Sequence, residues 1–166
     1  MDDDPLRVKA LNRAYRALAR RAHSECELRR KLIDDGYPEG IVAAVLDKCR
    51  DFGYLNDGQY ARQRARDLAL NRLAGDRRIA ADLRERGINE DLVREAITAV
   101  RCEVGEPEAL ERLVLKKTKG VAPAALDDRQ KVRLARGLMG KGFPPGLVFK
   151  ALKREQGSKI DGDDGQ

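Results

Sequence analysis

The sequence is poor in the residues that most enzymes use for chemistry. It has one histidine, His23, three cysteines and no tryptophan among 166 residues. A Ser-His-Asp or Cys-His catalytic arrangement would need His23, and a transition-metal site needs several imidazole or thiolate ligands. No G-x-x-x-x-G-K-[ST] segment that would bind nucleotide phosphates occurs. We therefore predict no enzyme activity, no catalytic residue, no metal and no cofactor, with His23 a partly exposed loop residue.

Two further absences bear on where the protein works. Cys26, Cys49 and Cys102 are far apart and form no C-x-x-C pair, so reduced and mostly buried thiols are expected. No window approaches 18 consecutive apolar residues, and residues 1–5 are acidic where a signal peptide would be basic and then apolar. We expect a cytoplasmic protein that does not enter a membrane.

What the sequence does contain is an internal repeat marked by Gly36, Gly87 and Gly142. Apolar residues stand eight and four positions before each glycine, which places both on one face of a helix. The six residues, which we assign to the core, are Leu28, Leu32, Ile79, Leu83, Leu134 and Leu138. An apolar residue also follows each glycine directly, as expected where glycine ends a helix in the left-handed conformation. These apolar residues are Tyr37, Ile88 and Phe143.

Helical patterns also flank each of these second helices. Apolar pairs recur five and six, and again nine and ten, residues beyond each glycine, so a third helix follows it. Residues 11–22, 59–73 and 108–119 have helical composition and precede the glycines. No alternating run of strand length occurs, so we predict an all-α protein of three tandem three-helix repeats in an elongated or curved array. Our predicted boundaries are 1–9 (acidic lead), 10–54, 55–104 and 105–156 (repeats), and 157–166 (disordered acidic tail).

Residues that favour the start of a helix support this division of the chain into helices and repeats. Ser24 with Glu27 forms a capping-box pattern, and Asn56 with Gln59 resembles one. Further caps are expected at Asp76, at Asn89 and at Asp127 or Asp128, and Pro107 suits a first helical turn. The connection from Gly120 to Asp128 is the longest, and we predict that it is the most flexible loop.

Positive charge is concentrated in the body of the chain. The whole chain carries a formal charge of +6, but residues 5–156 hold 33 basic and 22 acidic side chains. This excess favours an acidic partner such as single- or double-stranded DNA or a negatively charged protein groove, although many basic proteins bind no nucleic acid.

Three cationic clusters are candidates for that contact. The residues that we favour for binding are Arg62, Arg66, Arg72, Arg77 and Arg78 in the arginine-rich second repeat, with Lys116 and Lys117 in the third. Another cluster, Arg13, Arg16, Arg20 and Arg21, lies on the first predicted helix. The alternative is that these side chains only form solvated helix faces. Tyr15 and Tyr60 are the tyrosines available for base stacking, since Tyr37 and Tyr54 follow helix-ending glycines.

Three segments in register resemble the RecX family. They read H-S-E-C-E-L-R-R-K-L at 23–32, G-Y-L-N-D at 53–57 and I-A-A-D-L-R-E-R-G-I at 79–88, and weaker similarity continues to about Lys153. The resemblance implies three-helix repeats and adds Leu55 to the predicted core. It also implies a non-enzymatic regulator that binds the RecA filament on single-stranded DNA. Such a regulator inhibits the ATPase, strand-exchange and co-protease activities of RecA and thereby modulates recombinational repair and the SOS response.

A second function fits the same charge pattern. The chain could be a general helical module for single-stranded nucleic acid, in which case RecA would be inhibited only by competition for DNA. Direct phosphate contacts would make such binding steeply salt-dependent. For either function we expect a monomer.

Overall fold

A computed structural model describes residues 4–153. All regular secondary structure in this part of the chain is helical, which confirms the predicted fold class. Its helices are α1 (Pro5–Arg20), α2 (Glu25–Asp34), α3 (Glu39–Asp51), α4 (Asp57–Arg66), η1 (Asp67–Asn71), α5 (Asp76–Glu85), α6 (Glu90–Glu103), α7 (Glu106–Thr118), η2 (Pro123–Ala125), α8 (Asp128–Gly140) and α9 (Pro145–Lys153).

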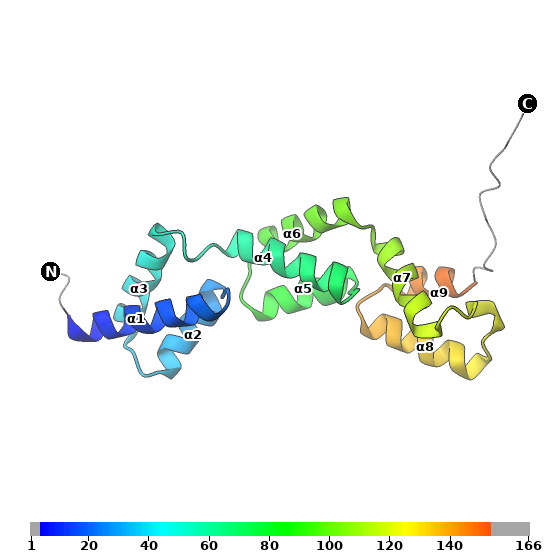
Figure 1. Ribbon diagram of the computed structural model, residues 1–166, viewed down its shortest axis with the longest axis horizontal. Coiled ribbons are helices and arrows are strands. Elements are labelled where there is room, and N and C mark those ends of the chain that lie inside the picture. The colour runs from blue at the N-terminus through cyan, green and yellow to red at the C-terminus, as the bar shows by residue number, and fades with distance from the viewer. Residues whose placement is uncertain (1–3, 154–166) are drawn as a thin grey trace, which may run out of the picture.

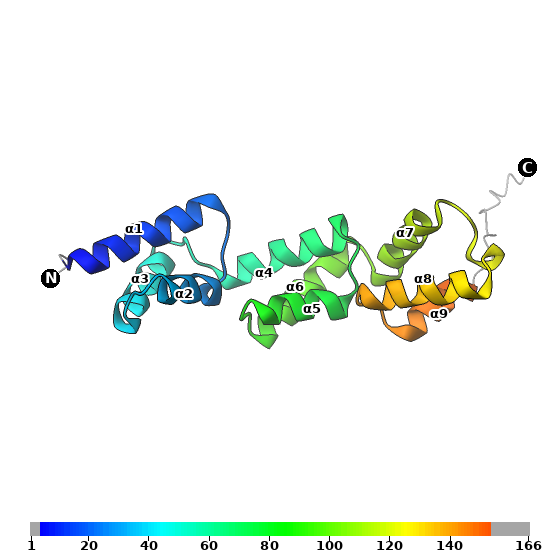
Figure 2. The same cartoon turned by 90° about the horizontal axis from the view of Figure 1, so that it is seen from below.

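The helices form three groups that follow one another along the long axis of the molecule (Figures 1 and 2). We refer to α1–α3 as unit 1, α4–α6 as unit 2 and α7–α9 as unit 3. Within the described residues, no helix is both long and apolar enough to cross a membrane.

The second helix of each unit ends as its glycine predicts. Gly36, Gly87 and Gly142 have φ angles of 90°, 75° and 94°. The amide of the residue after each glycine donates a hydrogen bond to the carbonyl five residues earlier, as in Tyr37 N to Leu32 O at 3.1 Å. This closes the last helical turn and leads the chain into the third helix.

Side chains start most helices where expected. Ser24 with Glu27 forms a complete capping box, and so does Asp127 with Gln130. Asn56 and Asn89 cap α4 and α6. The prediction for Asp76 was wrong, because Gly75 occupies the cap position and the Asp76 side chain bonds Arg101 instead.

The helices also extend beyond their predicted limits. Helix α1 begins at Pro5, capped by Asp4, so residues 5–9 are helical and do not form a separate lead. Helix α4 passes into the π-helical segment η1, and the connection before α8 contains the 3-10 turn η2. The predicted tail, residues 157–166, lies outside the described residues.

Two apolar cores stabilise the row. Unit 1 has its own core, whereas units 2 and 3 share a continuous one. Most of the residues assigned to the core are fully buried or nearly so: Leu28, Leu32, Leu55, Ile79, Leu83 and Leu138. Leu134 is only half-buried, packed at the edge of the shared core.

Candidate interaction surface

The contact between units 1 and 2 is built on the start of α2. The Ser24 hydroxyl donates a hydrogen bond to the Arg86 carbonyl at 2.6 Å, and the Glu25 amide donates one to Asp57 Oδ1 at 2.8 Å. Because Arg86 and Asp57 belong to unit 2, the Ser24 hydroxyl and the Glu25 amide at the start of α2 both donate hydrogen bonds to the next unit. Burial raises the pKa of Asp57 above its ordinary value.

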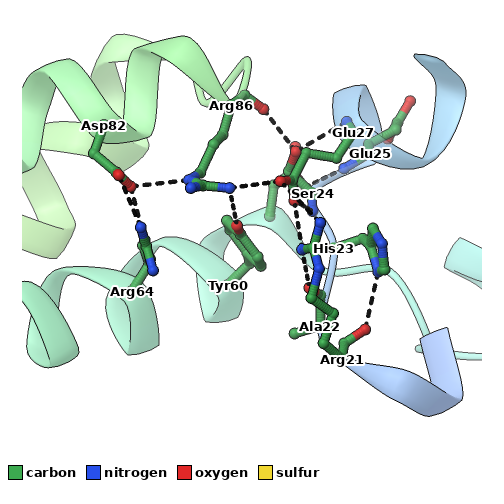
Figure 3. Close-up of polar contacts among 11 residues, drawn as sticks. Arg21, Ala22, His23, Ser24, Glu25, Glu27, Tyr60, Arg64, Asp82 and Arg86 are labelled. Carbon is green, nitrogen blue, oxygen red and sulfur yellow. Dashed lines mark hydrogen bonds and ion pairs between the residues drawn. The ribbon is translucent and has the colours of Figure 1, made fainter. Parts of the chain in front are cut away.

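A chain of ion pairs extends this contact into unit 2. Asp82 accepts from Arg64 Nε at 2.7 Å and from Arg86 Nε at 2.9 Å, while Arg86 Nη1 donates to Glu27 of unit 1 at 2.5 Å. Figure 3 shows Arg86 between the two carboxylates, with the Tyr60 hydroxyl 3.3 Å from Nη1. The Arg64 hydrogen bond, reinforced by Arg86, lowers the pKa of Asp82 to about 2, so its carboxylate is charged at neutral pH.

The contact between units 2 and 3 repeats the same plan. The Gly75 amide donates to the Lys141 carbonyl at 2.9 Å, and the Asp76 amide donates to Glu106 Oε1 at 2.9 Å. Gly75 is the cap of α5 as Ser24 is of α2, and Lys141 precedes its glycine as Arg86 does. Burial again raises the pKa of the accepting carboxyl, here Glu106.

The glycines that end the second helices also make these contacts tight. A Cβ atom on Gly87 would stand closer than 3.0 Å to Cys26 of unit 1, and one on Gly142 would stand equally close to the Arg78 backbone of unit 2. Gly36 has no preceding unit in the described chain and has nothing within 4 Å. Two joints with the same plan of contacts therefore connect the three units.

The favoured cations project from this row, but they fall into two groups. Arg66 pairs with Glu103 at 2.7 Å and Arg72 with Asp67 at 3.3 Å, so part of their charge is already neutralised. The others are exposed and have no ion pair with any residue in 4–153: Arg62, Arg77, Arg78, Lys116 and Lys117. They lie on α4, the start of α5 and the end of α7, on two successive units.

A further cationic site lies on unit 1, in a cleft of about 290 Å³ between α1 and α2. We name it the α1–α2 cleft; its lining residues are Arg13, Arg16, Ala17, Arg20, Arg21, His23 and Lys31. Arg13 and Arg21 are paired with Asp35 and Glu27, whereas Arg16, Arg20 and Lys31 have no ion pair within the described chain. The cleft has no acidic lining residue, which makes it suitable for an anion.

His23 lies deeper than predicted. Only 8% of it is exposed, and its Nδ1 is 2.9 Å from the Arg21 carbonyl. Burial lowers its pKa below the ordinary value. The expectation of mostly buried thiols was also wrong in part, since Cys49 is buried, Cys26 half-buried and Cys102 exposed. No cluster of metal-ligating side chains occurs between residues 4 and 153.

Comparison with known sequences and structures assigns the family. Three family models, described as the first, second and third three-helix domains of RecX, match residues 10–49, 56–97 and 105–152. "Regulatory protein RecX" of Syntrophotalea carbinolica is 31% identical over 90% of this chain and 98% of its own length. The protein of the same name from Mycolicibacterium vanbaalenii is 32% identical over 84% of this chain and 78% of its own.

The chain belongs to the RecX family.

A solved structure described as the crystal structure of regulatory protein RecX agrees with this assignment. It superimposes with a TM-score of 0.73 at 27% identity, covering 90% of this chain and 72% of that one. The three matched RecX domains coincide with units 1, 2 and 3, so the two joints described above connect successive RecX domains.

The two tyrosines predicted to be available for base stacking, Tyr15 and Tyr60, are not freely exposed. Tyr60 is 9% exposed and its hydroxyl is engaged by Arg86, so it is not available for stacking. Tyr15 is half-buried, with its ring edge-to-face against Tyr54 at 5.5 Å. Tyr54, which follows the helix-ending Gly53, is largely exposed although its amide closes the α3 turn. The exposed aromatic residues of the described chain are thus Phe52, Tyr54 and Phe149, and not the predicted Tyr60.

The sequence predicted the cationic cluster on α1 but did not indicate that Lys31 lies beside it. Lys31 lies on α2, and only the antiparallel packing of α1 on α2 brings it to the α1–α2 cleft. A usable signal existed, because Lys31 precedes the buried Leu32 and so lies beside the packed face of α2.

Proposed function

We propose that this RecX family member is a non-enzymatic negative regulator of RecA that works in the cytoplasm as a monomer. It binds the RecA filament on single-stranded DNA and inhibits ATP hydrolysis, strand exchange and co-protease activity, which modulates recombinational repair and the SOS response. The observation that carries the proposal is the jointed row of three RecX domains with unpaired cations on successive units.

A fixed row suits a filament better than a single binding site does. Contacts from different units reach different places on the filament, and after the first contact forms the others act at high effective concentration. Because the joints already fix the geometry of the units, little conformational entropy is lost on binding. A ligand that bridges adjacent filament subunits resists the rearrangements that hydrolysis and strand exchange require.

The deciding experiment is an ATPase assay on pre-formed RecA filaments with single-stranded DNA in excess over all protein. We expect inhibition, because the excess DNA removes competition for free strands as a cause. Full ATPase activity in the presence of this protein would contradict the proposal.

The favoured binding residues can be tested in the same assay. Charge reversal of the unpaired pair, Arg77→Glu with Arg78→Glu, should weaken inhibition by about tenfold or more. The matched control, Arg94→Glu with Arg112→Glu, makes the same charge change at exposed arginines that already pair with neighbouring acids on their own helices. Equal effects of the two double variants would show that only net charge matters.

The α1–α2 cleft favours a second candidate function, direct binding of nucleic acid. Arg16, Arg20 and Lys31 converge there without acidic partners, as a phosphate-binding site requires. If this is the main activity, the logarithm of the affinity for bare single-stranded DNA should fall with the logarithm of salt concentration by about 0.7 per phosphate contacted. Tight binding to bare DNA together with no effect on pre-formed filaments would favour this candidate.

A further inference from the structure

Unit 3 has an open groove of about 510 Å³ between α8 and α9. Its floor is apolar, formed by Val132, Met139, Phe149 and Leu152 among others. Val132 and Phe149 are 51% and 52% exposed, and both line this one groove, so their exposed apolar atoms form a contiguous patch. The α8 residues that line it recur at the spacing of one helix face, over about 10 Å of helix from Val132 to Met139.

The equivalent positions of units 1 and 2 carry smaller, covered or charged side chains at two or more of the three positions compared. Counted from the capping glycine of each unit, Val132 corresponds to Cys26 and Arg77, and Cys26 is covered by Gly87 of the next unit. Phe149 corresponds in the same way to Ala43 of unit 1 and Arg94 of unit 2.

Met139 follows the same pattern. Its counterparts are Ile33 of unit 1 and Arg84 of unit 2, and Arg84 is ion-paired with Glu90. Ile33 is also apolar and 43% exposed, so unit 1 keeps one of the three apolar positions, whereas among the described units only unit 3 combines Val132, Met139 and Phe149.

The rim of the groove is positively charged. Lys131 and Arg136 on α8 and Lys153 on α9 line it. Within residues 4–153, no acidic residue lines it and none of the three cations has an ion pair. Two helices with an apolar seam between them provide the geometry that binds a third, amphipathic helix. Cations on both sides of the seam favour carboxylates beside the apolar stripe of that helix.

We propose that the α8–α9 groove of unit 3 binds an amphipathic helix of a RecA subunit, with apolar side chains in the groove and flanking carboxylates on Lys131, Arg136 and Lys153. This rests on the proposed function, since it assigns the protein contact of the filament to one surface. About two turns of the partner helix match the length of the apolar face, which corresponds to anchors at i, i+3 or i+4, and i+7.

A photo-cross-linker placed in the groove tests the contact directly. Phe149 is replaced by p-benzoylphenylalanine, and the full-length protein is irradiated on RecA filaments with single-stranded DNA. The control carries the same group at Phe52, which is 60% exposed on unit 1. We expect a RecA adduct from position 149 in clear excess over position 52. An adduct with DNA, or with a second copy of this chain, would overturn the inference, as would equal RecA adducts from both positions.

Charge reversal provides an independent measurement. Lys131→Glu with Arg136→Glu changes the rim, whereas Arg129→Glu with Arg133→Glu makes the same charge change on α8 outside the lining residues. We expect the rim variant to weaken filament affinity about tenfold and the control less than about threefold. Circular dichroism melts establish that both variants fold.

Failure of this inference can be separated from failure of the proposed function. If the wild-type protein inhibits filament ATPase but the rim variant inhibits equally well, the groove is not the contact and the function stands. If the wild-type protein neither inhibits nor binds the filament, both proposals are overturned.

Discussion

At the scale of single residues, the capping glycines carry two constraints at once. Gly36, Gly87 and Gly142 all need a positive φ, but only Gly87 and Gly142 also lie against the preceding unit. Substitution at the three positions separates backbone strain from the joint contact, since Gly36 has the first constraint alone.

We expect Gly36→Ala to lower the free energy of unfolding by about 1–2 kcal/mol, the cost of a left-handed non-glycine residue. Gly87→Ala should cost clearly more, because its Cβ would overlap the Cys26 side chain at its stiff Cβ end. Urea unfolding of both variants checks this prediction. Equal losses at the two positions would mean that the joint between units 1 and 2 opens easily.

Asp82 makes stability depend on pH in the acid range. Its folded pKa of about 2 lies below the ordinary value of 3.8, so its contribution is present above the ordinary pKa and is lost as pH falls from about 5 toward 2. The shift corresponds to about 2 kcal/mol at neutral pH. Asp82→Asn should lose at least that amount at pH 7, and the difference from wild type should shrink as pH falls. The exposed Asp91→Asn, whose partner is Arg94, should show no such dependence.

At the scale of elements, the end of α7 has a non-glycine residue in the left-handed conformation, as does Leu73 just after η1. Lys119 adopts φ 52° at the C-cap and is followed by Gly120 at φ 84°, so a non-glycine residue carries left-handed strain there. Lys119 is exposed, so little packing opposes its replacement.

Lys119→Gly should therefore stabilise the protein by about 0.5–1 kcal/mol, since relief of strain exceeds the extra entropy of glycine. Lys117→Gly, inside the same helix, should destabilise it by about 1 kcal/mol. Thermal melts of the two variants provide the measurement. A loss of stability in both variants would show that the Lys119 side chain stabilises the fold by more free energy than its left-handed backbone conformation costs.

The elements were predictable because their signals are local. Leu28 and Leu32 lie one helical turn apart before Gly36, and a helix face and its cap can be inferred from such spacing alone. The cap of α5 was misplaced to Asp76 because aspartate is the better capping residue in isolation. The joint needs Gly75 at that position, and no local pattern reveals a contact with Gly142.

The candidate surface was less predictable for the same reason. Arg62 and Arg66 lie one helical turn apart, and their local sequence does not distinguish them as binding candidates. In the structure, Glu103, which is 37 residues away in sequence, pairs with Arg66 only. His23 precedes the helix cap Ser24, and this position predicts a partly exposed loop residue. In the structure it is buried where α1 meets α2. Which cations stay free, and which loop residues are covered, depends on contacts between distant segments.

At the scale of the whole molecule, the joint between units 2 and 3 can be tested without backbone strain. Gly75 has an ordinary φ of −78°, but a Cβ there would stand 2.5 Å from the Gly142 carbonyl carbon. Gly105 is also a helix cap at φ −62°, and the nearest atom to its Cβ is Pro107 Cδ at 3.7 Å.

We expect Gly75→Ala to weaken the joint by about 1–3 kcal/mol and to let unit 3 unfold partly on its own. Hydrogen exchange followed by mass spectrometry should then show faster exchange in α7–α9, with α1–α3 unchanged. Gly105→Ala should leave the pattern close to wild type. Uniform acceleration along the chain would indicate that the whole array unfolds as one cooperative body.

The equivalence of the two joints has a consequence for how such arrays change in length. In unit 2, the capping glycine Gly87 contacts unit 1 and the start of α5 at Gly75 contacts unit 3. One unit therefore contains both halves of a joint. A gene duplication that copies one unit in frame would insert a module that already carries both halves of a joint. Its side chains would still have to adapt, because Gly87 fits against Cys26 whereas Gly142 fits against Arg78.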